Sequence, residues 1–171
     1  MLLIHGSGPG ASGWANFSRN MAPLARHFRA ICSDLPGFGK SDMKPVGSPI
    51  PGFFADSVNH FLYDPSQLTE ALLQKRLEAS LDPRIVANPP MRITPGTVLE
   101  ELWRDPGLTK LPHETLMIWG REDRGLPLDS AFVLMQQIPR ARLLVMPQIG
   151  HWAQWEHAEE FNATVTQFFK P

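Results

Sequence analysis

Two stretches decide the fold of this chain: MIWGREDRGLP at residues 117–127 and GHW at residues 150–152. In the first, an apolar run typical of a buried strand ends in a glycine turn that carries Asp123. In the second, the apolar run 142–146 is followed by a turn that carries His151. An acid followed by a histidine, each just past the carboxyl end of a strand, is the order of the last two members of a Ser…Asp…His triad. In such a pair, the carboxylate orients the imidazole and stabilises its cation while the imidazole takes a proton from a nucleophile.

Each of these motifs also has a purely structural interpretation. Asp123 could cap a helix or pair with Arg121 or Arg124, and His151 could be a core histidine with satisfied hydrogen bonds. The segment 34–41 could be a bare turn. The joint order of the motifs and their shared position at strand carboxyl ends favour catalysis over these alternatives.

The composition limits the classes of protein. The 171 residues are 43% apolar, which is enough for the core of one domain, and the net charge of −1 indicates neither nucleic acid nor an anionic membrane as partner. The single cysteine, Cys32, excludes an internal disulfide and favours a reducing, cytoplasmic location. No apolar run reaches transmembrane length, and the first residues lack the features of a signal peptide.

Hydrophobic periodicity predicts an α/β order. Strands are expected at 1–5, 28–33, 115–119 and 142–146, and helices at 16–28, 96–104, 128–137 and 156–169. A further helix is predicted to begin with Asp64 as N-cap and Pro65 as first residue, with Leu68, Leu72, Leu73 and Leu77 on its apolar face. The prolines and glycines of 42–56 predict an irregular segment. A strand, helix, strand succession predicts parallel pairing at each end of the chain.

A glycine-rich turn, HGSGPG at residues 5–10, follows the first predicted strand. Glycines there let backbone N–H groups approach a developing oxyanion, although a tight turn or a phosphate cradle has the same appearance. A dinucleotide site is excluded, because the third glycine comes too early and no acidic residue closes the unit at the required distance.

Five motifs together resemble one family. They are HGSGPG (5–10), WANFSRN (14–20), DLPGFGKSD (34–42), WGREDR (119–124) and GHWAQWEH (150–157). The chain resembles the meta-cleavage product hydrolases, α/β-hydrolases that cut a carbon–carbon bond in dienoate ring-fission products of aromatic catabolism. The resemblance covers nearly all of the chain except about residues 43–58.

The resemblance implies roles for particular residues. His151 resembles the catalytic base and Asp123 its orienting acid. Gly6, Ser7 and Gly8 would form the loop for the oxyanion and the substrate enolate, Asn16 would contact substrate, and Arg76 would be a lid arginine facing the dienoate carboxylate. Trp103 and Trp152 would wall the pocket. For Arg76, a solvated helix face beside Lys75 remains an alternative. No metal and no cofactor are expected.

The family also requires a nucleophile elbow, G-x-S-x-G, and no serine here meets that pattern. Ser7 has His5 and Pro9 two residues away, and Ser12 has Trp14. We therefore expect an incomplete α/β-hydrolase fold, with a mostly parallel sheet, flanking helices and a partial helical lid. It would lack the first two family strands and an internal segment with the elbow. The expected parts are core at 1–42 and 111–171, a linker at the deletion junction over 43–60, and a lid remnant over 61–110.

Three functional hypotheses follow from these observations. The first is a carbon–carbon bond hydrolase of aromatic catabolism with impaired or absent activity. The second is a non-catalytic remnant that binds a dienoate through Ser7, Asn16 and Arg76, or that pairs with an intact homologue or another copy. The third, the least favoured, is residual esterase action by Ser7 with His151.

Overall fold

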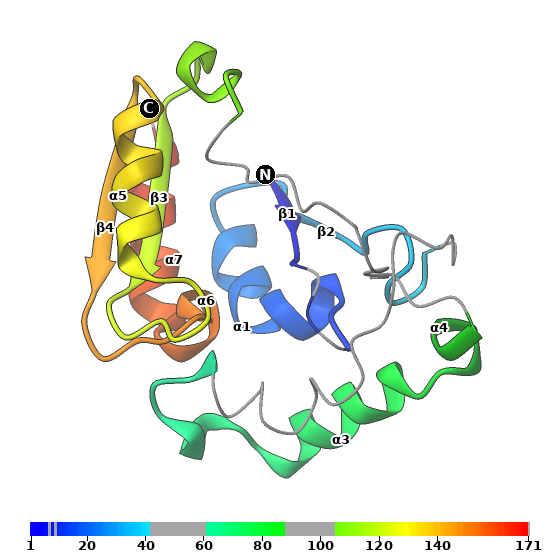
Figure 1. Ribbon diagram of the computed structural model, residues 1–171. Coiled ribbons are helices and arrows are strands. Elements are labelled where there is room, and N and C mark those ends of the chain that lie inside the picture. The colour runs from blue at the N-terminus through cyan, green and yellow to red at the C-terminus, as the bar shows by residue number, and fades with distance from the viewer. Residues whose placement is uncertain (7, 9, 42–60, 88–104, 171) are drawn as a thin grey trace, which may run out of the picture. The chain divides into compact units, whose positions relative to one another are not determined.

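The computed structural model describes residues 1–6, 8, 10–41, 61–87 and 105–170, and these form two compact units. The described part of the first unit comprises 1–6, 8, 10–41 and 66–87, and that of the second comprises 61–65 and 105–170. Figure 1 colours the chain from blue to red along its length. The predicted linker 43–60 and the predicted helix 96–104 lie outside the described residues.

The first unit begins with a βαβ element, as predicted. Strands β1 (Leu2–Ile4) and β2 (Ile31–Ser33) pair in parallel, with helix α1 (Gly13–Ala25) between them in sequence. The helix starts and ends three residues earlier than predicted, because Ser12 caps it by accepting a hydrogen bond from the backbone N–H of Ala15 at 3.1 Å. Leu24 of α1 is fully buried.

The helix predicted from Asp64 and Pro65 begins later than expected. Pro65–Gln67 form a single 3₁₀ turn, η1, and α3 (Glu70–Ser80) starts after Thr69, whose side chain accepts from the Leu72 N–H at 3.2 Å. The predicted apolar face is wrong in part, since Leu77 is exposed and the buried positions of α3 are Leu72 and Arg76. A short helix, α4 (Pro83–Ala87), follows α3 and was not predicted.

The second unit contains a longer βαβ element. Strands β3 (Thr115–Gly120) and β4 (Ala141–Met146) pair in parallel over six residues, joined by α5 (Leu128–Gln137), which has the predicted bounds. A 3₁₀ turn, η3 (Leu108–Lys110), precedes β3. The single helix predicted for 156–169 is instead α6 (Ala153–Glu156) and α7 (Ala158–Phe169), because the backbone of His157 leaves the helical region with φ −123° and ψ 56°.

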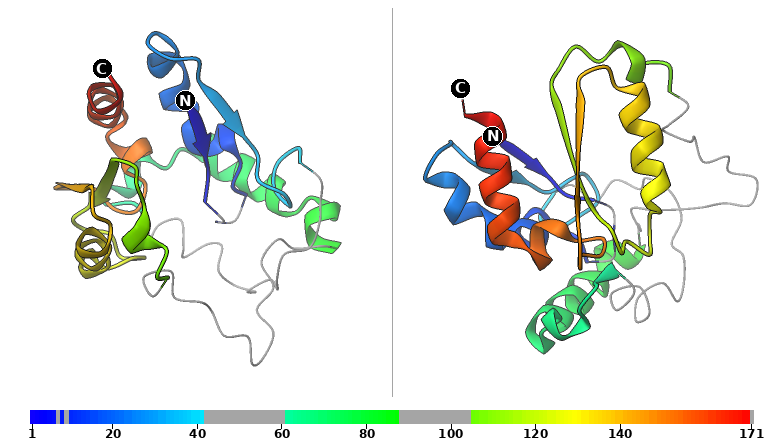
Figure 2. Two further views of the ribbon diagram at one scale, coloured as in Figure 1. Left: turned by 90° about the horizontal axis from the view of Figure 1, so that it is seen from above. Right: turned by 90° about the vertical axis from the view of Figure 1, so that its left-hand side faces the viewer.

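Helices cover both faces of the β3–β4 pair. Figure 2 shows α5 on one side of the two strands and α7 on the other. Beneath them, Met146, Ile149 and Ala153 form a buried apolar cluster against which Ile118 and Leu144 pack. Met146 ends β4, and Ile149 and Ala153 flank His151 in sequence, so this cluster supports the segment that carries His151.

Within the described ranges, no helix is long and apolar enough to cross a membrane. The same residues contain no group of three or more His, Cys, Asp or Glu side chains placed to hold a metal ion.

Candidate active site

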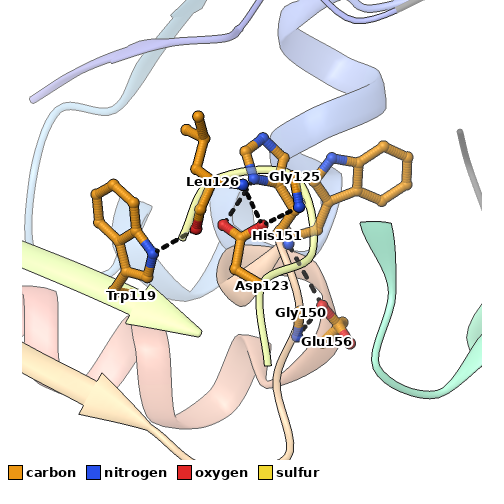
Figure 3. Close-up of polar contacts among 8 residues, drawn as sticks. Trp119, Asp123, Gly125, Leu126, Gly150, His151 and Glu156 are labelled. Carbon is orange, nitrogen blue, oxygen red and sulfur yellow. Dashed lines mark hydrogen bonds and ion pairs between the residues drawn. The ribbon is translucent and has the colours of Figure 1, made fainter. Parts of the chain in front are cut away.

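The structure brings Asp123 and His151 together in the second unit. The Nδ1 atom of His151 lies 2.8 Å from Oδ2 of Asp123 (Figure 3). The Asp123 side chain is only 5% exposed and that of His151 is 31% exposed. The acid is therefore enclosed, while the imidazole remains accessible on one side.

The turn after β3 holds the Asp123 carboxylate. Its Oδ1 atom accepts hydrogen bonds from the backbone N–H groups of Gly125 at 2.8 Å and Leu126 at 2.9 Å. The indole N–H of Trp119 donates to the Leu126 carbonyl at 3.2 Å, which ties the far side of this turn to the strand. Both carboxylate oxygens thus have fixed partners (Figure 3).

These contacts decide the charge of the pair. Burial raises the pKa of Asp123, but the hydrogen bonds from His151, Leu126 and Gly125 outweigh it, and the net pKa lies below the usual value. An ionised Asp123 can only accept, so Nδ1 of a neutral His151 carries the proton and Nε2 has a free lone pair. An imidazole held in this tautomer can take a proton from a substrate, a hydroxyl group or water.

Two of the structural alternatives for Asp123, pairing with Arg121 and capping α5, do not match the contacts. Arg121 pairs with Glu122 at 2.7 Å. The N-cap position of α5 is Pro127, not Asp123.

One residue beside the imidazole was not predicted. Phe61 precedes His151 by 90 residues, yet its carbonyl accepts the His151 backbone N–H at 2.6 Å and its ring lies 4.9 Å from the imidazole, centroid to centroid. No sequence pattern links the two positions, because the contact depends on tertiary packing. Trp152, predicted to wall the pocket, is buried, and its ring lies 6.2 Å from that of Phe61.

In the first unit, Arg76 and Asn16 form a second cluster of predicted site residues. Nη2 of Arg76 lies 3.5 Å from Oδ1 of Asn16, and the Asn16 amide group donates to the Ser12 carbonyl at 2.9 Å. Arg76 is 3% exposed, so the alternative of a solvated helix face is wrong, whereas Lys75 beside it is exposed. Burial lowers the pKa of Arg76 to about 10, which leaves the guanidinium charged at neutral pH.

Gly10, which follows β1, lies against α3, the helix that carries Arg76. Gly10, with φ 59°, approaches the backbone of Arg76 so closely that a Cβ would collide with it. His5 holds the start of the turn: its Nε2 accepts from the Leu35 N–H at 3.0 Å, so Nδ1 carries the proton and donates to the Gly6 carbonyl at 2.6 Å. Gly6 and Gly8 have open space at the Cβ position. Ser7 and Trp103 lie outside the described residues.

Comparison with known proteins assigns the chain to a family. No family model matches the sequence. The chain is, however, 31% identical to 2-hydroxy-6-oxononadienedioate/2-hydroxy-6-oxononatrienedioate hydrolase 2 of Pseudomonas putida, over 99% of this chain and 87% of that protein. The chain belongs to the meta-cleavage product hydrolases.

Solved structures agree with this assignment. A meta-cleavage product hydrolase from Pseudomonas fluorescens IP01 superposes with a TM-score of 0.77 at 25% identity, covering 98% of this chain and 89% of that chain. A serine hydrolase from the polyaromatic-hydrocarbon-degrading bacterium Cycloclasticus zankles has a TM-score of 0.82 at 22% identity, covering 98% and 88%. The fold class expected from the sequence, an incomplete α/β-hydrolase fold, is confirmed by these neighbours and by the two short parallel sheets.

This meta-cleavage product hydrolase is internally shorter than its relatives. The alignment with the Pseudomonas putida hydrolase extends over 258 residues, whereas the whole chain has 171, so at least 87 aligned positions have no residue here.

Proposed function

We propose that this chain is a meta-cleavage product hydrolase that binds a dienoate ring-fission product but lacks the serine nucleophile, and so cleaves its substrate far more slowly than a complete relative. One observation carries the proposal. The chain retains an aspartate–histidine pair in hydrogen-bonding geometry, yet none of its 171 residues is a serine in a G-x-S-x-G context.

The residues that remain can perform part of the chemistry. Nε2 of His151 is positioned to take a proton, and Asp123 would stabilise the resulting imidazolium. Without a serine hydroxyl to deprotonate, the attacking nucleophile would be water, which is not held against the substrate by a strained elbow. Triads that lose one member keep some rate from the oxyanion hole and from binding alone, so slow turnover does not imply a hidden nucleophile.

Arg76 and Asn16 support the recognition of a carboxylate. A buried guanidinium that stays charged is suited to a planar carboxylate, because it can donate two parallel hydrogen bonds. Asn16 lies beside it and offers an amide group. The name of the Pseudomonas putida relative describes a dioate, which carries a carboxylate at each end, and a single buried cation would bind one of the two.

The first experiment follows the absorbance of a yellow dienoate ring-fission product mixed with the purified chain. We expect turnover at least about 10⁴-fold below that of the complete Pseudomonas putida hydrolase, with a further loss in His151→Ala. Ser7→Ala tests esterase-like use of that hydroxyl, because a residual rate that is unchanged in this variant would exclude it. Turnover at the rate of the complete enzyme, lost in His151→Ala, would refute the missing-nucleophile proposal.

A second candidate function, binding without turnover, is favoured by the burial of Arg76 beside Asn16. It predicts a saturable titration with the dienoate even when no decay is seen. Arg76→Met should weaken binding by roughly 10- to 100-fold, since it removes charge-assisted hydrogen bonds while keeping an unbranched side chain. The matched control is Lys75→Met on the exposed face of the same helix. Equal affinity in both variants would exclude Arg76 as the carboxylate site.

A further inference from the structure

Glu156, at the end of α6, is hydrogen-bonded to the backbone on both sides of His151. Its Oε1 atom accepts from the N–H of Gly150 at 3.0 Å and from the N–H of Trp152 at 3.3 Å (Figure 3). Its Oε2 atom accepts from the N–H of Tyr63 at 2.6 Å. We propose that Glu156 is a positioning residue, which fixes the imidazole of His151 against Asp123 by holding the flanking backbone and the segment 61–63 together.

The segment 61–63 has little freedom where it meets the histidine turn. Gly150 has no room for a Cβ, because the Phe61 carbonyl and the Tyr63 amide would collide with it. The same Phe61 carbonyl accepts the His151 N–H, and the Phe61 ring lies against the imidazole. The tilt of the imidazole therefore depends on Phe61, and Phe61 is held next to the turn by the bond from Tyr63 to Glu156.

The chemistry of these bonds requires a carboxylate. Gly150, Trp152 and Tyr63 all present N–H donors, and the Asp64 backbone adds a further one, so both side-chain oxygens must accept. A glutamine at this position would direct its own NH₂ group at one set of these donors and leave them unsatisfied. Such a loss at a buried site costs more than the bond itself contributes.

Burial raises the pKa of Glu156, although the four backbone N–H groups oppose that rise. Other titratable side chains in the region of Glu156 are those of Asp123 and His151, of Asp64 next to Tyr63, and of His157 next to Glu156. The positioning role belongs to the ionised form, because a protonated Glu156 would lose acceptor capacity.

The inference concerns how His151 is held and does not require turnover, so its test uses the magnetic resonance of the imidazole rather than activity. The Nδ1 proton of His151 in the intact chain, assigned by its absence in His151→Ala, reports the bond to Asp123. In Glu156→Gln we expect this proton to exchange with water roughly 10- to 100-fold faster, or to broaden beyond detection. The control Glu159→Gln removes the same charge from an exposed position and should leave the signal unchanged. A native-like exchange rate in Glu156→Gln would overturn the proposal.

A measurement on the unmodified chain covers the case in which Glu156→Gln fails to fold. The amide protons of Tyr63, Gly150 and Trp152 should share one titration step, shifted upward from the usual glutamate pKa by the burial of Glu156. Failure of the three amides to shift together would contradict the shared contact. Glu156→Asp, which keeps the charge but shortens the side chain, should give exchange of the Nδ1 proton between that of the native chain and that of Glu156→Gln.

Discussion

The two βαβ elements of this chain have the same topology but differ in how they end. β1 and β2 pair over three residues, and Leu2, Ile4 and Ile31 of these strands are exposed. β3 and β4 pair over six residues, and the hydrogen bonds continue past the strands, from Arg121 N–H to the Met146 carbonyl and from Glu122 N–H to the Ile149 carbonyl.

The comparison shows where the chemistry is fixed. In the second unit, the turns that carry Asp123 and His151 are joined to each other, so this hydrogen-bonded pair lies entirely within residues 61–65 and 105–170. In the first unit, the turn after β1 is held through His5 and through the contact of Gly10 with Arg76. The hydrogen-bonded pair Asp123–His151 and the cluster of Arg76 with Asn16 can therefore be disrupted one at a time.

The largest expected effect comes from adding a methyl group to the closest contact of the second unit. A Cβ on Gly120 would collide with the carbonyl groups of Gly150 and Ile149, so Gly120→Ala should destabilise the protein by about 3 kcal/mol. Gly8→Ala in the first unit meets nothing within 4 Å and should change stability by less than about 0.5 kcal/mol. Urea unfolding measures both, and equal losses would contradict the comparison.

A smaller effect is expected at the aspartates that follow β3 and β2. Asp123→Asn should cost about 2 kcal/mol near pH 7, because His151 and two backbone N–H groups donate to the carboxylate. The folded pKa of Asp123 is lowered, so its contribution is present above the unfolded pKa and is lost as the pH falls through the folded pKa. Urea unfolding of the native chain and of Asp123→Asn should therefore converge in strong acid.

The matched change in the first unit is Asp34→Asn. Asp34 accepts from the N–H groups of Gly13 at 2.7 Å and Lys40 at 2.9 Å, and losing one of these bonds should cost about 1 kcal/mol near pH 7. A larger loss than that of Asp123→Asn would reverse the ranking of the two turns.

The smallest effect concerns backbone conformation. Gln148, between β4 and His151, has φ 59°, a value that costs energy for most residues other than glycine and asparagine. Gln148→Asn should stabilise the protein by about 0.5 kcal/mol in thermal unfolding, since asparagine tolerates this region best among residues with a side chain. No gain, or a loss, would indicate that the glutamine side chain has a compensating role.

The sequence predicted the parts of the fold that depend on local periodicity. The helix 128–137, the parallel pairing at each end and the acid–base pair are visible in apolar runs and in the residues after them. The predicted start of α3 was wrong because both Asp64–Pro65 and Thr69 have the residue types of a helix N-terminus. Only the hydrogen bond from the Leu72 N–H to the Thr69 side chain shows that Thr69 is the N-cap.

The contacts around His151 could be predicted only in part. Asp123 was found because a carboxylate and a histidine follow strands in a known order. No sequence pattern of this kind identifies Phe61 or Glu156. Phe61 is one of many aromatic residues, and its contact with the imidazole is seen only in the structure. Glu156 has the sequence context of an ordinary helix carboxylate, and only the structure shows its hydrogen bond from Gly150. The role of Arg76 as a lid arginine stays a prediction from the resemblance. Its burial was not predicted, because helical periodicity placed Leu77 on the apolar face, whereas Arg76 is buried and Leu77 is exposed.

The bond between Tyr63 and Glu156 has a consequence for the order of folding. It joins residues 93 positions apart, whereas β3 and β4 pair residues such as Thr115 and Ala141, which are separated by 26. Closing the longer loop costs about 1 kcal/mol more in chain entropy, and contacts distant in sequence tend to form late. The β3–α5–β4 element should therefore assemble first, with Asp123 in place, and His151 should acquire its final orientation only when the segment around Tyr63 docks.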